Sequence, residues 1–222
     1  MSAMSPWARP LYAGLASHVL LKTTAACLIA GGFFLGYFLL LKFPLYAVTL
    51  MPVTAPDRWI ALRPGALWLY VSLWPFVALA PGLLSDRREL LDYYKAMVAL
   101  SLAGMTVFLL WPTASPRPPI DWQLYPPLGP IIAADDAGNA LPSLHAAFAV
   151  YTGLWIEWLL RRAAAPAWLR GFNAAWALGI LYSTIATRQH VAVDIEAGSA
   201  LGGLAAWLHR RWRGSRMAPA DA

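Results

Sequence analysis

The sequence predicts an all-α protein, a polytopic membrane helical bundle of about six transmembrane helices. Hydrophobic residues occupy 59% of the 222 positions and charged residues 13%, and the mean hydropathy is +0.53. A soluble domain of this composition would have too few polar side chains to cover its surface. The apolar residues also gather into stretches of spanning length, about 17 to 25 residues each. Because no long polar linker separates these stretches, we expect residues 1–222 to form a single membrane-embedded domain.

Six apolar stretches follow one another along the chain, at 19–41, 66–84, 94–111, 143–160, 170–187 and 191–208. The first is longer than the apolar core of a cleavable signal peptide, which has about 7 to 15 residues, so we expect it to remain as an anchor. The sole cysteine, Cys27, lies inside it as a small hydrophobic residue and has no partner for an intramolecular disulfide. The fifth stretch is short, so we expect it to be the one that is tilted or broken.

Two proline-rich loops, 42–65 and 112–142, interrupt the apolar pattern. Proline lacks a backbone donor, and this density of proline argues against regular helix in either loop. A loop near 30 residues long is commonly a lid or a binding loop. Two interpretations of 112–142 therefore stay open: a collar at the membrane surface, or a cover over a lipid headgroup.

Basic residues are distributed unequally between the two sides of the predicted bundle. Five lie on one side: Lys42, Arg58, Arg63, Arg117 and Arg188. Twelve lie on the other: Arg9, Lys22, Arg87, Arg88, Lys95, Arg161, Arg162, Arg170, Arg210, Arg211, Arg213 and Arg216. Since short cytoplasmic loops carry the positive excess, we expect a multi-pass plasma (inner) membrane protein with both termini in the cytoplasm. The segment 112–142 then faces the outer, periplasmic side.

The net charge of +6 indicates which partners to expect. Because it comes mainly from the loops and tail assigned to the cytoplasm, anionic lipid headgroups in the bilayer are the natural partners. Nucleic acid is not implied. The sequence does not indicate an oligomeric state.

Ionisable side chains gather at the ends of two apolar stretches. His145 follows Pro142 and Ser143, while His190 and Asp194 open the sixth stretch. Ionisable groups at membrane depth are costly, which favours a functional role. On an α-helix, His190 and Asp194 would share one face, four residues apart. Asp194 would then hold one ring nitrogen of His190 and leave the other as a nucleophile.

His145 is predicted to lie in the first turn of its helix, where free backbone N–H groups favour an anion. Ser143 is the expected N-cap and would also lie near an anion bound there. A protonated His145 would act as a general acid, while Arg117 and Arg188 would bind the remaining oxygens of such an anion. Each residue also has a purely structural interpretation: an interfacial histidine, two snorkelling arginines and a simple helix cap. We assign the i, i+4 pair Glu157 and Arg161 to structure.

The motif Pro142-Ser143-Leu144-His145 and the segment 187–198, TRQHVAVDIEAG, resemble the second and third signatures of the type 2 phosphatidic acid phosphatase superfamily. The resemblance is greater to its inositol-phosphorylceramide-synthase-like branch and covers about residues 90–205. The superfamily's first signature is half present, because Arg117-Pro118 matches while Leu110 stands where a lysine is usual. In the third signature, Thr184 stands at the usual arginine position, and Arg188 lies two residues before His190.

The resemblance implies a six-helix membrane enzyme that transfers phosphoryl or phosphoalcohol groups through a phosphohistidine, with no metal and no cofactor. We expect a lipid-phosphate phosphatase, with His190 as nucleophile, His145 as general acid and base, and Asp194 as the orienting carboxylate. The substrate would be a membrane lipid phosphate or diphosphate. The chain is short and has no appended soluble domain to hold a polar alcohol, so we expect water to resolve the intermediate.

Three alternatives stay open. With an alcohol as acceptor, the same site would be a phosphoalcohol transferase resembling inositol-phosphorylceramide synthase. A metal-dependent hydrolase would use His145, His190 and Asp194 as three ligands. A lipid carrier would bind a headgroup without chemistry.

Overall fold

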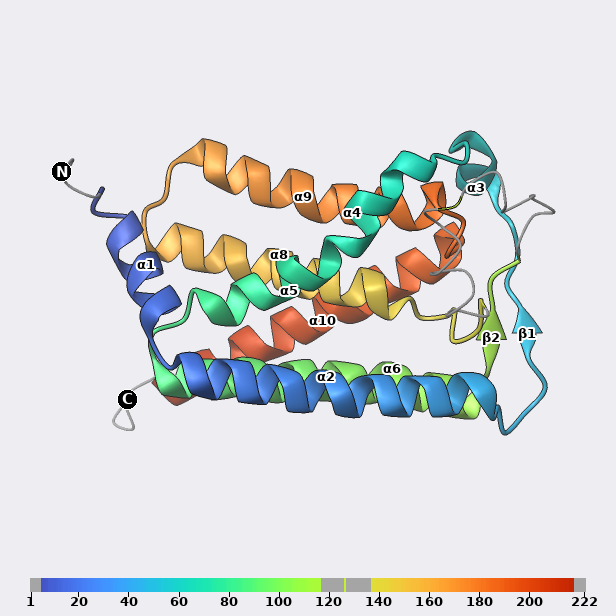
Figure 1. The fold of residues 1–222 in the computed structure, drawn as a ribbon, viewed down its shortest axis with the longest axis horizontal. Helices are drawn as coiled ribbons and strands as arrows, with labels where there is room; N and C mark the ends of the chain where they lie inside the picture. The colour runs from blue at the N-terminus through green and yellow to red at the C-terminus, as the bar shows by residue number, and fades with distance from the viewer. Residues whose placement is uncertain (1–4, 117–125, 127–136, 218–222) are drawn as a thin grey trace.

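The long helices of the computed structural model run side by side along one axis (Figure 1). The structure describes residues 5–116, 126 and 137–217. The long helices are α2 (Val19–Lys42), α6 (Arg87–Leu110), α8 (Leu144–Arg162), α9 (Ala167–Ala186) and α10 (Ala192–Met217). The prediction of an all-α, polytopic membrane bundle is confirmed.

Within the described residues, three helical segments are long and apolar enough to cross a membrane: Val19–Lys42, Pro64–Gly82 and Arg87–Leu110. These segments support a membrane protein on length and composition. The number of six passes stays a prediction.

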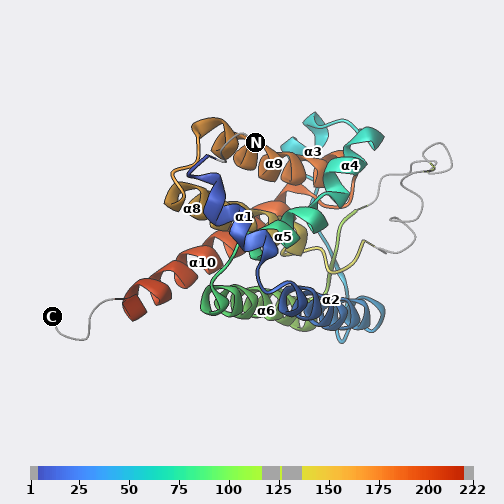
Figure 2. The ribbon, with the colours of Figure 1, turned by 60° about the vertical axis from the view of Figure 1, so that its left-hand side comes forward.

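Helix α8 lies at the centre of the bundle. Viewed closer to end-on, α2 and α6 form one layer, α9 lies at the opposite side, and α8, α5 (Leu73–Gly82) and α10 fill the space between them (Figure 2). Most side chains of α8 are buried, against α5, α9 and α10. The core therefore surrounds the helix that begins at the motif containing His145.

The second apolar stretch is not one helix. It consists of a 3₁₀ turn, Pro64–Ala66, then α4 (Leu67–Val71) and α5 (Leu73–Gly82), with Ser72 at the break. The Ser72 hydroxyl donates to the Leu69 carbonyl at 2.6 Å and accepts from Nε1 of Trp176 at 2.9 Å. A serine that bonds to its own backbone in this way disturbs regular helix. The fifth stretch, for which a tilt or a break was expected, is the unbroken helix α9, and its tilt in a membrane stays a prediction.

Short elements cover one end of the bundle. Helix α3 (Ala55–Trp59) lies within the first proline-rich loop, so the exclusion of helix there was wrong. Pro56 is in its first turn, where a missing N–H costs nothing, and Thr54 and Asp57 form a capping box. Strands β1 (Thr49–Leu50) and β2 (Thr113–Ala114) pair in parallel nearby. Most of the second proline-rich loop lies outside the described residues.

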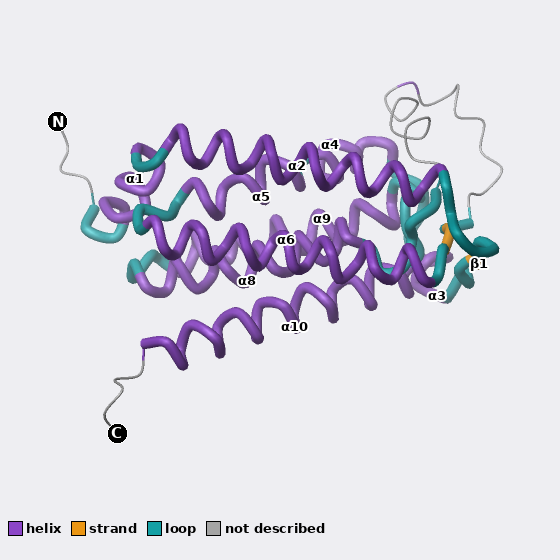
Figure 3. The backbone as a smooth tube through the Cα atoms, turned by 90° about the horizontal axis from the view of Figure 1, so that it is seen from below, coloured by secondary structure: helices purple, strands orange, loops and turns teal. Residues whose placement is uncertain are grey.

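Two glycines of α10 permit its close approach to α8. A Cβ at Gly198 would collide with the Ser143 carbonyl, and one at Gly202 would collide with the Ala147 carbonyl. The N-terminal halves of the two helices are therefore in backbone contact, which joins the segment containing Ser143 to the first turns of α10. Figure 3 shows α10 leaning away from the other helices toward its C-terminal end.

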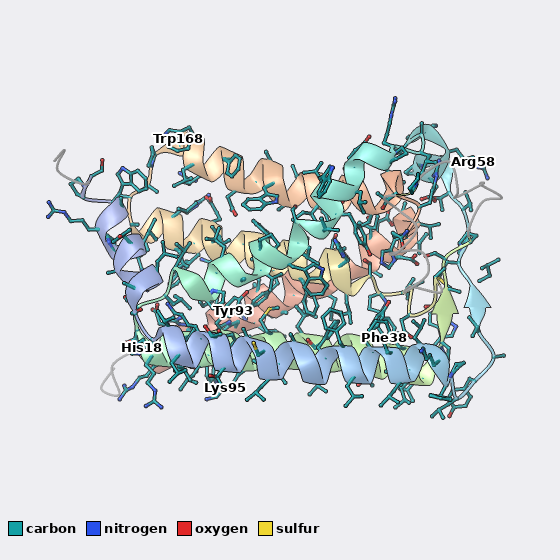
Figure 4. The ribbon with its side chains drawn as sticks, viewed as in Figure 1. His18, Phe38, Arg58, Tyr93, Lys95 and Trp168 are labelled. Carbon is teal, nitrogen blue, oxygen red and sulfur yellow. The ribbon has the colours of Figure 1, made fainter. Side chains whose placement is uncertain are left out.

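The opposite end of the bundle holds α1 (Ala8–Ala16), the turn between α8 and α9, and the C-terminal end of α10 (Figure 1). Glu89 there pairs with Arg162 and Arg213, both at 2.5 Å. The predicted pair of Glu157 and Arg161 is present at 2.5 Å. Lys95 lies toward this end of the bundle, whereas Arg58 lies at the end that holds α3 (Figure 4). Which end faces the cytoplasm stays a prediction.

Candidate active site

His145 and His190 line one cavity near the end of the bundle that holds α3 and the strands. Its volume is about 260 Å³. Asn139 adds a polar group, while Val71, Leu73 and Leu144 add aliphatic surface. The rest of the wall is aromatic, with rings from α2, α4, α5 and α8: Phe33, Phe34, Tyr37, Phe38, Tyr70, Trp74 and Phe148. An apolar cavity with a few convergent polar groups is the usual form of a small-molecule site.

The broken second stretch contributes directly to this cavity. Tyr70 belongs to α4 and Trp74 to α5, on either side of the break at Ser72. The Tyr70 ring stacks on the imidazole of His145, with centroids 4.1 Å apart and an interplanar angle of 14°. This contact fixes the plane of the His145 ring.

His145 is the second residue of α8, as the sequence predicted. Its Nε2 is buried and has no hydrogen-bond partner among the described residues. Ser143 is the N-cap: its hydroxyl oxygen accepts from the Ala146 N–H at 3.2 Å. The Ser143 N–H donates to the Asp194 carbonyl at 2.9 Å, which ties the start of α8 to the first turn of α10.

His190 and Asp194 are close in space, but they do not lie on one face of the same helix, as the sequence had suggested. His190 precedes α10, whereas Asp194 lies in its first turn. His190 Nδ1 and Asp194 Oδ2 are 3.5 Å apart and do not form a direct hydrogen bond. Oδ2 instead accepts from the Ser115 hydroxyl at 2.7 Å and from the Val191 N–H at 3.2 Å. The bond to Val191 is half of a capping box at the start of α10.

Arg188 is held away from the cavity by short contacts to the backbone of the α3 region. Its guanidinium donates to the carbonyls of Asp57 at 2.7 Å and Ile60 at 2.8 Å. Arg188 does not line the cavity. These bonds use two of the five guanidinium N–H donors, and the predicted phosphate contact stays a prediction. Arg117, the other predicted phosphate ligand, lies outside the described residues.

Two hydrogen-bonding residues near the site, Asp57 and Ser115, were not predicted from the sequence. Asp57 is 3% exposed, and its Oδ1 accepts from the Ala192 N–H at 2.7 Å. Ser115, also buried, donates to Asp194. The pattern Thr54-Ala55-Pro56-Asp57 signals a helix start and could have identified Asp57 as a cap. Nothing in the sequence signals the Ser115 contact, because its partner is 79 residues away.

No group of three His, Cys, Asp or Glu side chains that could hold a metal ion occurs in the part of the chain that the structure describes. His145, His190 and Asp194 are therefore brought to one region without forming such a group.

The fold and this region define a helical membrane protein with two histidines at an aromatic cavity. The chain belongs to the PAP2 superfamily, whose family model matches residues 92–218. Members of this superfamily are generally phosphatases or related phosphotransferases, so membership supports lipid-phosphate chemistry of this type. No match was found among curated proteins or among solved structures. The matched segment contains both histidines and excludes α2 to α5, which supply most of the aromatic wall.

Proposed function

We propose that this protein is an integral membrane lipid-phosphate phosphatase that acts through a phosphohistidine on His190. The observation that supports it most is that His145 and His190, from separate segments, line the same aromatic cavity. Such a cavity suits the apolar part of a lipid next to its phosphate, while two imidazoles suit nucleophilic and acid–base roles. Membership in the PAP2 superfamily supports the same chemistry.

In the first half-reaction, Nε2 of His190 forms a bond to phosphorus. The bond between phosphorus and the lipid oxygen breaks, and that oxygen takes a proton from His145. Asp194, 3.5 Å from Nδ1 of His190, stabilises the positive charge that the ring gains. Free N–H groups in the first turn of α8 would bind phosphate oxygens, since four amides at a helix start lack intrahelical acceptors.

In the second half-reaction, water attacks the phosphohistidine. Water gives a proton to His145, a P–O bond forms, the N–P bond breaks, and inorganic phosphate leaves. His145 is then protonated again and the site is ready for another turnover. Ser143, Arg117 and Arg188 are proposed phosphate contacts, although in the apo geometry Ser143 caps α8 and Arg188 binds carbonyls.

The charge distribution supports a site that opens away from the cytoplasm. The sequence assigns five of the seventeen basic residues to the side that holds the loop 112–142 and His190, and twelve to the other side. We therefore propose that the substrate comes from the outer leaflet. The termini would both be cytoplasmic.

The test is an assay of purified protein with a panel of lipid monophosphates and diphosphates. Inorganic phosphate and lipid products are measured with and without alcohols such as inositol. Release of phosphate by the wild type and its loss in His190→Ala are the expected results. If phosphate release is negligible while a new phosphoalcohol lipid accumulates, the protein is a transferase of the synthase-like branch. Binding of these lipids without any product would indicate a carrier.

A further inference from the structure

His190 lies on the short connection between α9 and α10, and this connection is attached on both sides of His190 to one segment, residues 54–60. Arg188 precedes His190 by two residues and Ala192 follows it by two. The guanidinium of Arg188 binds the carbonyls of Asp57 and Ile60, while the N–H of Ala192 binds the carboxylate of Asp57.

The Asp57 carboxylate is itself held in place. Oδ2 accepts from the N–H of Thr54 at 2.7 Å and from its hydroxyl at 2.8 Å, which leaves Oδ1 directed to Ala192 at 2.7 Å. The carboxylate accepts three hydrogen bonds, and Asp57 is only 3% exposed. The position of this buried carboxylate is therefore well determined. Hydrogen bonds to an ionised acceptor are stronger than those between neutral groups.

Two further contacts, one from Ile60 and one from Arg63 just beyond the segment, fix this part of the chain to the ends of α8, α9 and α10. The side chain of Ile60 packs against a buried cluster formed by Ala146, Ile185, Ala192 and Ile195. The N–H of Arg63 donates to the carbonyl of Ala186, at the end of α9, at 2.8 Å. The segment 54–60 is therefore part of the structure that surrounds His190, although it lies outside the family match at 92–218.

We propose that Asp57 is a positioning residue for His190. The expected effect of Asp57 on turnover rests on the proposed function, in which His190 is the nucleophile. Asp57 touches neither His190 nor the cavity, and acts by fixing the first turn of α10 and, through its carbonyl, Arg188. Arg188 needs this support because it has a φ of 59°, a left-handed conformation that is uncommon for a residue other than glycine. A displacement near 1 Å of a reacting group costs about 10²-fold in rate, so loss of this support reduces turnover more than substrate binding.

The experiment compares Asp57→Ala and Asp57→Asn with Glu196→Ala. Glu196 is a matched control, since it is an exposed acidic residue of the same helix, α10. Two quantities are measured on purified, folded protein: kcat and KM for a lipid phosphate, and the rate at which diethylpyrocarbonate modifies each histidine, followed by mass spectrometry. His18 is exposed, lies at the other end of the bundle and serves as the internal reference (Figure 4).

We expect Asp57→Ala to lower kcat by about 10²-fold with KM unchanged, and to raise the modification rate of His190 relative to His18. Asp57→Asn keeps one acceptor oxygen for Ala192 and is expected to fall between Asp57→Ala and the wild type. Glu196→Ala is expected to match the wild type. If Asp57→Ala does not fold, Asp57→Asn and Thr54→Ala, which removes one of the three donors, give the same comparison.

Unchanged kcat and unchanged His190 reactivity in folded Asp57 variants would overturn the proposal. An equal rise in reactivity of His18 and His190 would also overturn it, because that result indicates general loosening. Absence of turnover in the wild type would count against the proposed phosphatase function alone, since the modification rates still decide whether Asp57 positions His190.

Discussion

The hydroxyl of Ser115 donates a hydrogen bond of 2.7 Å to Oδ2 of Asp194, the same oxygen that lies 3.5 Å from Nδ1 of His190. With the Val191 N–H at 3.2 Å, three groups therefore converge on one carboxylate oxygen. In the described geometry the serine has the short contact and the histidine the longer one. Apo active sites often have long catalytic hydrogen bonds that tighten when substrate binds.

Replacement of His190 by alanine is expected to abolish turnover, because it removes the imidazole that forms the proposed phosphohistidine. Asp194→Asn keeps the shape of the side chain and is expected to lower kcat by about 10⁴-fold, the effect of losing the carboxylate that orients a catalytic histidine. Both are measured as phosphate release from a lipid phosphate. Wild-type rates in purified His190→Ala would remove His190 as the nucleophile.

Ser115→Ala is expected to lower stability more than activity. The change removes a donor from a buried carboxylate, which costs about 1–3 kcal/mol when a buried group loses its partner. It also frees Oδ2 of Asp194 to approach His190. Thermal unfolding monitored by circular dichroism measures the first effect, and steady-state kinetics the second. A loss of kcat as large as that of Asp194→Asn would show that Ser115 has a direct role in catalysis.

Exhaustive chelation is expected to leave activity unchanged if the proposed histidine chemistry is correct. In that mechanism, helix N–H groups and arginines stabilise the negative charge of the phosphate. The assay is phosphate release before and after dialysis against EDTA, with zinc or magnesium added back to a parallel sample. Loss of activity that either metal restores would favour the metal-dependent alternative.

The topology is tested with single cysteines in a Cys27→Ala background. Arg58 lies at the end of the bundle that holds the cavity (Figure 4), and Arg88 is exposed in the first turn of α6, which begins at the other end (Figure 1). Cysteine at position 58 is expected to react with an impermeant thiol reagent in spheroplasts, and cysteine at position 88 only after permeabilisation. The reverse labelling pattern would place the cavity on the cytoplasmic side.

The helices themselves could be predicted from hydropathy because each apolar stretch has to satisfy its backbone internally in a membrane. The stretch predicted at 19–41 is observed as Val19–Lys42, for example. The two histidine motifs could also be predicted, since ionisable residues stand out in an apolar sequence.

The connection that contains His190 could not be predicted in the same way. The residues Thr187-Arg188-Gln189-His190 include neither glycine nor proline, so nothing marks the end of α9 or the left-handed conformation of Arg188. The contacts of Asp57 and Ser115 arise from tertiary packing between segments far apart in the chain. The spacing of residues along the sequence does not predict such contacts.

Helix α9 returns the chain to the cavity end, so α8 and α10 both begin there and run parallel (Figure 1). Each helix N-terminus carries about half a positive elementary charge from its aligned peptide dipoles. At α10 this charge is neutralised by two carboxylates, those of Asp57 and Asp194. At α8 the cap is the neutral Ser143, and the first turn contains no acidic residue. An anion that enters the cavity therefore meets the positive end of α8, whose own first turn holds no carboxylate, beside His145.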